Sequence, residues 1–414
     1  MEHRTDYYLH TFPNGIRWVH KQVKHTKIAH CGIMLDLGSR DEAENELGIA
    51  HFWEHMAFKG TKSKNSSYIL HRIDSLGGEL NAYTTKEKIC FHASLLAKHF
   101  QKAIELLVDI TFNSTFPQKE IEKERQVILE EMTMYEDSPE DDIQDKFDDQ
   151  IFPGNSLANN ILGTKESVGR FNQVDFHHFL NTHINTSKLV ISTVSNQPVK
   201  RALKVVEKYA SNIPAITNNF IRTKPALPSK KLEIVKKPIN QTHCMMGRDA
   251  YPQGHENRLA FFMLSNLLGG PAMNTRLNIA IREKHGLVYT IDAQYSPYVD
   301  TGLFSIYFGA EKKNLKKATD LVLLELKKLR EIPLSASQLK SAKNQLKGQL
   351  AMSEENNNGM MMLLAKSILD LGHVESLDSI FNRIEAVTAE KLQMVANEML
   401  KEEDMCYLIF EPEK

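Results

Sequence analysis

Five consecutive residues, His51 to His55, carry the clearest chemical signal in this chain. They read His-Phe-Trp-Glu-His. Positions i, i+3 and i+4 of a helix share one face, so we expect His51, Glu54 and His55 to converge. Two imidazoles one turn apart are a natural pair of zinc ligands, and a neighbouring carboxylate can take a proton from water held by the metal. The segment therefore predicts a zinc centre of the inverted His-x-x-Glu-His type.

A chance match is the alternative interpretation of this motif. The chain has 17 histidines in 414 residues, and three fixed residues in five would occur by chance in roughly one such chain in twenty. The residues around the motif are apolar, namely Leu47, Ile49, Phe52, Met56 and Phe58. Two histidines and a glutamate on such a helix would lie buried or in a cleft without a reason unless they bind something. This context favours a metal site.

A third ligand is expected in the glutamate-rich segment Glu120 to Met132. Glu124 and Glu131 are seven residues apart, so they share a helix face with Val127 and Ile128. This apolar stripe is predicted to point inward. We interpret Glu131 as the third metal ligand and Glu124 as a carboxylate that orients a histidine, while the other glutamates of the segment form a solvated face.

Length and composition bound the class of protein. A chain of 414 residues exceeds what one core usually holds, so two or more domains are expected. The 42% hydrophobic and 25% charged content is typical of a soluble globular protein. The 51 Lys and Arg residues nearly balance the 52 Asp and Glu residues, which argues against nucleic acid or an anionic membrane as a partner.

Location and redox state are predicted from what the sequence lacks. Met1 to Asp6 shows no basic and apolar signal pattern, and no apolar run reaches membrane-spanning length, so a cytoplasmic location is expected. The four cysteines are scattered and form no Cys-x-x-Cys pair. They are predicted to be buried thiols, at Cys31, Cys90, Cys244 and Cys406.

Periodicity predicts how the first half positions these residues. Strands are expected at Tyr7–Phe12, Ile16–His20, about Ile28–Leu37, Leu80–Thr85, Lys88–Ala93 and Lys188–Val194. Helices are expected at Tyr68–Leu76, ending at Gly77-Gly78, at His99–Asn113 and at Gln118–Tyr135, with further helices between residues 140 and 185. A proline-containing stretch with little periodicity, residues 213–230, is predicted to be a linker between domains 1–212 and 231–414.

The second half repeats the first in order and spacing. The motif helix corresponds to Arg258–Leu268, and the helix ending at Gly77-Gly78 corresponds to Leu277–Gly286. The strand containing Tyr83 corresponds to Val288–Thr290. The two helices that follow it correspond to Leu315–Leu329 and Ser337–Leu350. Two copies of one unit are implied. The second copy has no His-x-x-Glu-His, and Gln349 occupies the position of Glu131. Metal chemistry is therefore expected in the first copy alone.

Together these motifs resemble the pitrilysin family of zinc peptidases. The resemblance rests on the stretch Gly48 to Thr61, on Gly77-Gly78 followed by Asn81 to Thr84, and on Glu124 to Glu131, with Glu131 placed 76 residues after His55. Within that family the chain is most similar to the catalytic subunit of mitochondrial processing peptidase and its bacterial relatives. It lacks the long glycine-rich loop of the non-catalytic subunit, so processing of presequences is not supported.

The resemblance implies a fold and a set of roles. It implies an α+β fold with two structurally similar domains, each an antiparallel-rich sheet packed by helices. His51, His55 and Glu131 would hold one zinc ion per chain, Glu54 would be the general base, and Glu124 would support the site.

The resemblance also implies where a substrate binds. Asn81, Ala82 and Tyr83 would lie on an edge strand that pairs with the substrate backbone. Arg282 and Tyr289 match a family pair that binds the substrate carbonyl; without the resemblance, a helix-end arginine and an interior strand tyrosine would be the simpler interpretation.

Three functions remain open at this point. The first is a zinc endopeptidase that hydrolyses peptides or unfolded polypeptide segments. The second is a catalytically silent, structural or peptide-binding member of the same fold, although such relatives usually lose ligands or the base. The third is a zinc hydrolase of small molecules. The resemblance further implies a two-subunit chamber, expected to be a homodimer, with a heterodimer of homologous subunits as the alternative.

Overall fold

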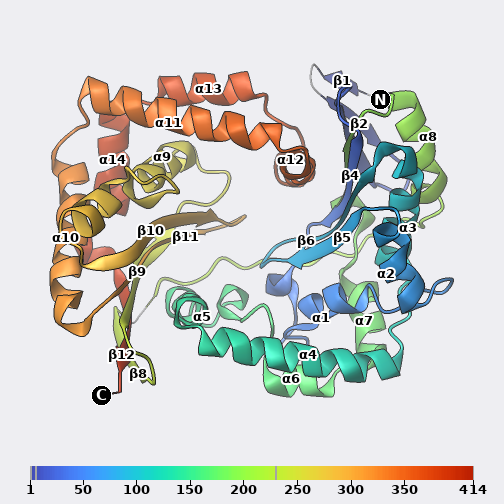
Figure 1. The fold of residues 1–414 in the computed structure, drawn as a ribbon, viewed down its shortest axis with the longest axis horizontal. Coiled ribbons are helices and arrows are strands. Elements are labelled where there is room, and N and C mark those ends of the chain that lie inside the picture. The colour runs from blue at the N-terminus through green and yellow to red at the C-terminus, as the bar shows by residue number, and fades with distance from the viewer. Residues whose placement is uncertain (1, 5–6, 229–230, 414) are drawn as a thin grey trace. The chain divides into compact units, whose positions relative to one another are not determined.

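The computed structural model describes residues 2–4, 7–228 and 231–413 and divides into two compact units. The first comprises residues 1–132, 159–222 and 352–376, and the second residues 133–158, 223–351 and 377–414. Each unit has its own sheet (Figure 1).

The sheet of the first unit has the order β1-β2-β3-β7-β4-β6-β5 over the described residues. Its strands are β1 (Glu2–Arg4), β2 (Tyr7–Thr11), β3 (Arg17–Gln22), β4 (Ile28–Leu35), β5 (Glu79–Thr84), β6 (Ile89–Leu96) and β7 (Leu189–Ser195). All pairs are antiparallel except β3 with β7. β7 is buried along its whole length, as a central strand with both faces covered should be.

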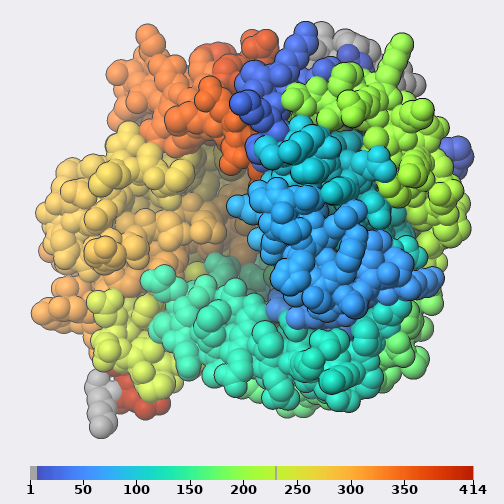
Figure 2. Space-filling view, turned by 45° about the vertical axis from the view of Figure 1, so that its right-hand side comes forward, coloured from blue at the N-terminus to red at the C-terminus, as the bar shows by residue number. Residues whose placement is uncertain are grey.

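Helices cover both faces of this sheet. They are α1 (Ile49–Met56), α2 (Ser66–Asp74), α3 (Phe100–Phe112), α4 (Gln118–Asp137), α6 (Lys165–Arg170), α7 (Gln173–His183) and α8 (Val199–Ala210). α1 contacts β5 and β6, α3 contacts β4 and β6, and α8 contacts β3. In the space-filling view, the blue and cyan segments and the light-green segment that includes α8 form a continuous surface of this unit (Figure 2). The predicted elements of this half are present, and none of their ends is shifted by more than three residues.

The second unit has a smaller sheet with the order β10-β11-β9-β12-β8 over its described residues. Its strands are β8 (Leu232–Lys237), β9 (Thr242–Ala250), β10 (Val288–Pro297), β11 (Gly302–Ala310) and β12 (Cys406–Pro412). Only the β12–β8 pair is parallel among these strands. The helices that follow in this half are α9 (Arg258–Gly269), α10 (Leu315–Glu331), α11 (Ala336–Glu355), α12 (Asn357–Leu371), α13 (Leu377–Ala386) and α14 (Ala389–Met399).

The two units exchange one helix each. α12 follows α11 in the chain, yet it packs on β4 and β7 of the first sheet (Figure 1). There Met361, Leu364 and Ile368 join a buried cluster with Met34 and Val190. The converse holds for the helix that follows α4.

That helix, α5 (Pro139–Ile151), packs on β9 and β12 of the second sheet. Ile143, Phe147 and Ile151 pack there with Met245 and Leu408. The division therefore differs from the predicted domains 1–212 and 231–414, because residues 133–158 and 352–376 are exchanged. The chain crosses from the first unit to the second between residues 222 and 223, which lie inside the predicted linker 213–230.

The internal duplication appears in the topology. The strand order β4-β6-β5 in the first sheet corresponds to β9-β11-β10 in the second, with β5 and β10 at the edges. The α+β class with two similar sheet-and-helix domains is confirmed. One predicted helix differs: within Leu277–Gly286, residues Asn278–Glu283 form a π-helix, η5, and the Lys284 N–H donates to the Ile279 carbonyl.

Two further expectations concern the cysteines and membrane-spanning helices. All four cysteines are buried and unpaired, as predicted. Across residues 2–4, 7–228 and 231–413, none of the helices combines the length and apolarity that crossing a membrane requires.

Candidate metal centre

The start of the motif helix α1 is held by a buried carboxylate. Gly48 precedes the helix with φ 90°. The side chain of Glu42 accepts hydrogen bonds from the Gly48 N–H at 2.9 Å and the Ala50 N–H at 2.8 Å. These N–H groups belong to the first turn, which has no acceptors within the helix itself. Glu42 thereby fixes where α1 begins.

The apolar side of α1 anchors it in the first unit. Phe52 and Trp53 are fully buried. Phe52 lies 5.1 Å from Phe176, and Trp53 lies 5.2 Å from Phe91 of β6, between ring centroids. Trp53 therefore faces away from the histidines, and the helix cannot rotate without breaking this packing.

Three predicted ligands come together. Nε2 of His51 lies 3.8 Å from Oε1 of Glu131, and Nε2 of His55 lies 3.5 Å from Oε2 of Glu131. One ligand atom from each residue can be chosen so that all lie within 4.8 Å of one another. Ligands about 2.1 Å from a tetrahedral ion are roughly 3.4 Å apart, so these residues fit a zinc-sized cation with small adjustments.

A second carboxylate orients one histidine. Nδ1 of His55 lies 3.0 Å from Oε1 of Glu124, and Nζ of Lys59 lies 2.5 Å from Oε2 of the same carboxylate. When Nδ1–H of His55 donates its hydrogen bond to Glu124, the lone pair on Nε2 is free to bind a cation. His51 lacks such a partner: its Nδ1 is buried without an acceptor among the described residues.

The two histidines have different protonation behaviour. Burial, and next the neighbouring charge of His55, lowers the pKa of His51 to about 3. Burial also opposes protonation of His55, but the hydrogen bond to Glu124 and the charges of Glu131 and Glu124 outweigh it and raise the His55 pKa. His51 is thus neutral at ordinary pH, whereas at His55 a proton would compete with any bound cation.

Glu54 stands beside the ligand cluster without joining it. Burial raises the pKa of its carboxyl, although Thr84 and His55 oppose this effect. Its Oε2 is buried and has no hydrogen-bond partner in the described part of the chain. A carboxylate with a raised pKa and a free oxygen is suited to accept a proton.

One predicted feature of α4 is wrong. Val127 was expected on the inward stripe with Glu124, Ile128 and Glu131, but it is 50% exposed. The buried stripe runs through Ile121, Glu124, Ile128 and Met132, at spacings of three and four residues. Val127 falls just outside this stripe, whereas Glu131 lies at its margin and is half-buried.

The predicted substrate strand is an edge strand. β5, which carries Asn81, Ala82 and Tyr83, pairs with β6 alone among the described strands and contacts α1. The Ala82 N–H donates to Oδ1 of Asn81 at 2.8 Å. The edge thus runs beside the helix that carries the histidines.

Arg282 and Tyr289 lie together in the second unit. The Arg282 guanidinium is 5.8 Å from the centroid of the Tyr289 ring. Tyr289 is 80% exposed, because β10 is an edge strand whose register shifts between Val288 and Ile291. An exposed pair on a bulged edge does not fit the simpler interpretation of an interior strand tyrosine.

Sequence reasoning missed two supporting residues, Lys59 and Glu42. Both stand near the motif, but a lysine and a glutamate near a helix end are common, so composition gave no signal. Their partners, Glu124 for Lys59 and the first turn of α1 for Glu42, are visible only in three dimensions. The second copy has no equivalent: within the described residues the one cluster able to hold a metal is that of His51, His55 and Glu131.

Comparisons with known proteins agree with this geometry. Residues 17–165 match the family model "Insulinase (Peptidase family M16)", and residues 170–346 match "Peptidase M16 inactive domain". The chain is 33% identical over 400 residues to the uncharacterized zinc protease YmxG of Bacillus subtilis, covering 97% of each chain. It is 30% identical to an uncharacterized zinc protease of Streptomyces coelicolor, covering 94% of this chain and 86% of that one.

A solved structure shows the same fold. A peptidase M16 inactive domain from Pseudomonas fluorescens superposes with a TM-score of 0.91 at 17% identity, covering 99% of this chain and 98% of that chain. The chain belongs to peptidase family M16, the pitrilysin family, so the predicted family is confirmed. The more specific similarity to the processing peptidase subunit stays a prediction.

Proposed function

We propose that this chain is a zinc metalloendopeptidase that hydrolyses peptides or unfolded polypeptide segments. The observation that carries the proposal is the convergence of His51, His55 and Glu131 around one point, with Glu54 beside them. Three ligands and an open position are typical of hydrolytic rather than structural zinc sites. The names of the relatives, which are zinc proteases, support the same metal.

Each residue has a distinct role in this proposal. Zinc, when bound, would polarise the scissile carbonyl and make water more acidic. Glu54 accepts the proton of the attacking water and delivers it to the leaving amine. Glu124, held by Lys59, keeps His55 in the tautomer whose Nε2 is a ligand.

The substrate backbone is proposed to add to the free edge of β5. An incoming extended peptide would displace the Asn81 side chain from the Ala82 N–H and pair with Asn81, Ala82 and Tyr83. Backbone pairing requires an extended chain, which favours peptides and unfolded segments over folded proteins. We further propose that Arg282 and Tyr289 bind the substrate carbonyl, and that they act on the zinc centre of a second chain in a dimer.

The silent member of the fold is the second candidate. One observation favours it: a family model that describes an inactive domain matches residues 170–346. That match covers the half without the cluster, whereas the three ligands and Glu54 all lie within residues 17–165. The intact first half therefore favours the enzyme.

A peptide library separates the alternatives. Zinc-loaded protein is incubated with quenched fluorescent peptides, with and without a chelator, beside a zinc-loaded Glu54→Gln sample. We expect cleavage that the chelator abolishes and that falls about 10²–10⁴-fold in Glu54→Gln, because an amide cannot accept the proton. Binding without cleavage would indicate the silent member, and no action on any peptide would leave the small-molecule hydrolase.

A further inference from the structure

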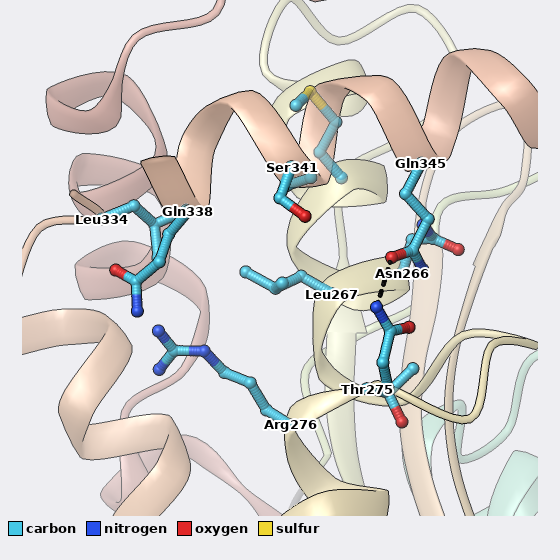
Figure 3. Close-up of a pocket in the computed structure, with 11 residues that line it drawn as sticks. Asn266, Leu267, Thr275, Arg276, Leu334, Gln338, Ser341 and Gln345 are labelled. Atoms are coloured by element: carbon cyan, nitrogen blue, oxygen red, sulfur yellow. Dashed lines mark hydrogen bonds between the residues drawn. The ribbon is translucent and has the colours of Figure 1, made fainter. Parts of the chain in front are cut away.

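A pocket of about 190 Å³ lies in the second unit, whereas the ligand cluster belongs to the first. It is lined by α9, by the loop that leads into η5, and by the first half of α11 (Figure 3). Its apolar surface comes from Met263, Leu267 and Leu334. The pocket is large enough to admit a ligand of about the size of an amino acid.

One charged side chain, Arg276, lines this pocket; no carboxylate does among the lining residues. The side chain of Arg276 is 20% exposed, and its Nη1 lies 3.7 Å from Oε2 of Glu325, too far for a hydrogen bond. Glu325 is held more closely by Lys328, at 2.6 Å. Burial lowers the pKa of Arg276 despite Glu325. The guanidinium is therefore within ion-pair distance of Glu325 but makes no hydrogen bond in the described part of the chain, so its N–H donors remain available to a ligand.

Gln338 adds a second donor beside it. Oε1 of Gln338 accepts a hydrogen bond from the Ser335 N–H at 3.0 Å, and the Gln338 N–H donates to Oγ of Ser335 at 3.3 Å. These reciprocal bonds form a capping box at the start of α11. They also settle the amide orientation, so the NH₂ group faces away from Ser335. In Figure 3 this amide and the Arg276 guanidinium extend toward one another.

The far side of the pocket offers neutral polar groups. Nδ2 of Asn274 donates to Oε1 of Gln345 at 3.1 Å, which leaves Oδ1 of Asn274 and Nε2 of Gln345 for a ligand. Leu267 projects between Gln345 and Arg276 (Figure 3). The pocket thus has a cationic donor end, an apolar middle and an amide end.

We propose that this pocket binds a small organic carboxylate of about the size of an amino acid, with its carboxylate against Arg276 and Gln338. Guanidinium groups bind carboxylates through paired N–H donors, and the Gln338 amide supplies a further one. A single positive charge matches a monoanion better than a phosphate ester, which carries nearly two negative charges. The apolar middle selects a ligand with an aliphatic body over a bare inorganic anion.

Binding can be measured on the full chain by isothermal titration. The probes are the free amino acids and glycyl dipeptides, each compared with its own C-terminal amide, and inorganic phosphate. A ligand of this size that uses these contacts should bind with a Kd on the order of 0.1–1 mM. We expect at least one carboxylate to bind saturably and its amide to bind at least tenfold more weakly. The two probe series distinguish a free amino acid from the end of a short peptide.

Gln338→Glu is the decisive variant. Glutamate preserves the capping box, so the fold should be retained, but its carboxylate would pair with Arg276 and repel the ligand. We expect at least a tenfold loss of binding in Gln338→Glu and in Arg276→Gln. Lys340→Gln is the matched control, because it removes an exposed charge from α11 outside the pocket and should bind normally.

Three results would overturn the proposal: no carboxylate binds, binding persists in Gln338→Glu, or phosphate binds more tightly than every carboxylate. None of these measurements depends on peptidase activity, so failure here and failure of the proposed enzyme are distinguishable.

Discussion

Lys59 and Glu124 form an ion pair of 2.5 Å directly behind the candidate metal centre. The other oxygen of Glu124 accepts a hydrogen bond from Nδ1–H of His55, with 3.0 Å between the oxygen and the nitrogen. Burial would raise the pKa of Glu124, but the hydrogen bonds from His55 and Lys59 outweigh it and lower that pKa. The ammonium charge of Lys59 is thus connected through the Glu124 carboxylate to His55, a predicted metal ligand.

Replacement of Lys59 should weaken metal binding although Lys59 touches no ligand. In Lys59→Gln the Glu124 carboxylate loses its cation, so it orients His55 less firmly. We expect zinc affinity to fall about 10–100-fold, which is typical for residues behind the ligands. Competition with a chromogenic chelator measures this. Lys123→Gln, an exposed lysine on α4 paired with Glu120, should keep full affinity; an equal loss in both variants would mean that general charge, not this pair, is responsible.

Glu131 is expected to be a direct ligand. Glu131→Gln should lose most of the zinc, because a neutral amide is a much weaker ligand than a carboxylate. Metal analysis after dialysis tests this. Glu130→Gln is the control, since Glu130 is exposed one position earlier on α4. Full zinc retention in Glu131→Gln would exclude Glu131 from the ligand set.

Zinc binding should release one proton below about pH 6.5. The pKa of His55 is raised above 6.5, so His55 is protonated there and must lose its proton to bind zinc. His51, with a pKa of about 3, is already neutral. Affinity should therefore fall about tenfold for each pH unit between about 6.5 and 5, and level off above the raised pKa of His55. Titration calorimetry in buffers of different ionisation enthalpy counts the protons. Two protons per zinc would contradict the difference between the histidines.

Gly48 should not tolerate a side chain. Its φ is 90°, and a Cβ atom there would lie 2.4 Å from the Leu162 carbonyl oxygen. Gly48→Ala combines a left-handed backbone with a steric clash, so we expect a loss of at least about 2 kcal/mol in the free energy of unfolding. Gly169→Ala is the control: it lies in α6 with open space around it, and alanine there should stabilise by up to about 1 kcal/mol. Denaturant unfolding gives both values.

Complementation tests the proposed dimer. If Arg282 and Tyr289 of one chain serve the zinc centre of another, mixing inactive Glu54→Gln and Arg282→Ala chains should restore activity. With random exchange half the dimers are mixed and each has one intact site, so about a quarter of wild-type activity should return. If labelled subunits exchange and no activity appears, each active site is built within a single chain.

The sequence by itself determined the features that depend on local spacing. His51, Glu54 and His55 share a helix face because of helical geometry alone. Glu124 and Glu131, seven residues apart, lie on one side of α4 for the same reason, because α4 is one uninterrupted helix. The duplication was visible for the same reason, since it is a repeat of local patterns. The edge position of Asn81 to Tyr83 followed from the family resemblance instead.

Only the tertiary structure decided which apolar faces meet. Hydrophobic periodicity shows that α5 and α12 each have a face to bury, but it does not say which sheet accepts that face, and both helices pack on the sheet of the other half. Likewise Val127 and Ile128 are equally apolar neighbours, and packing alone buried one and exposed the other. The link from Lys59 through Glu124 to His55 joins residues up to 69 positions apart, so it exists only once α1 and α4 are packed together.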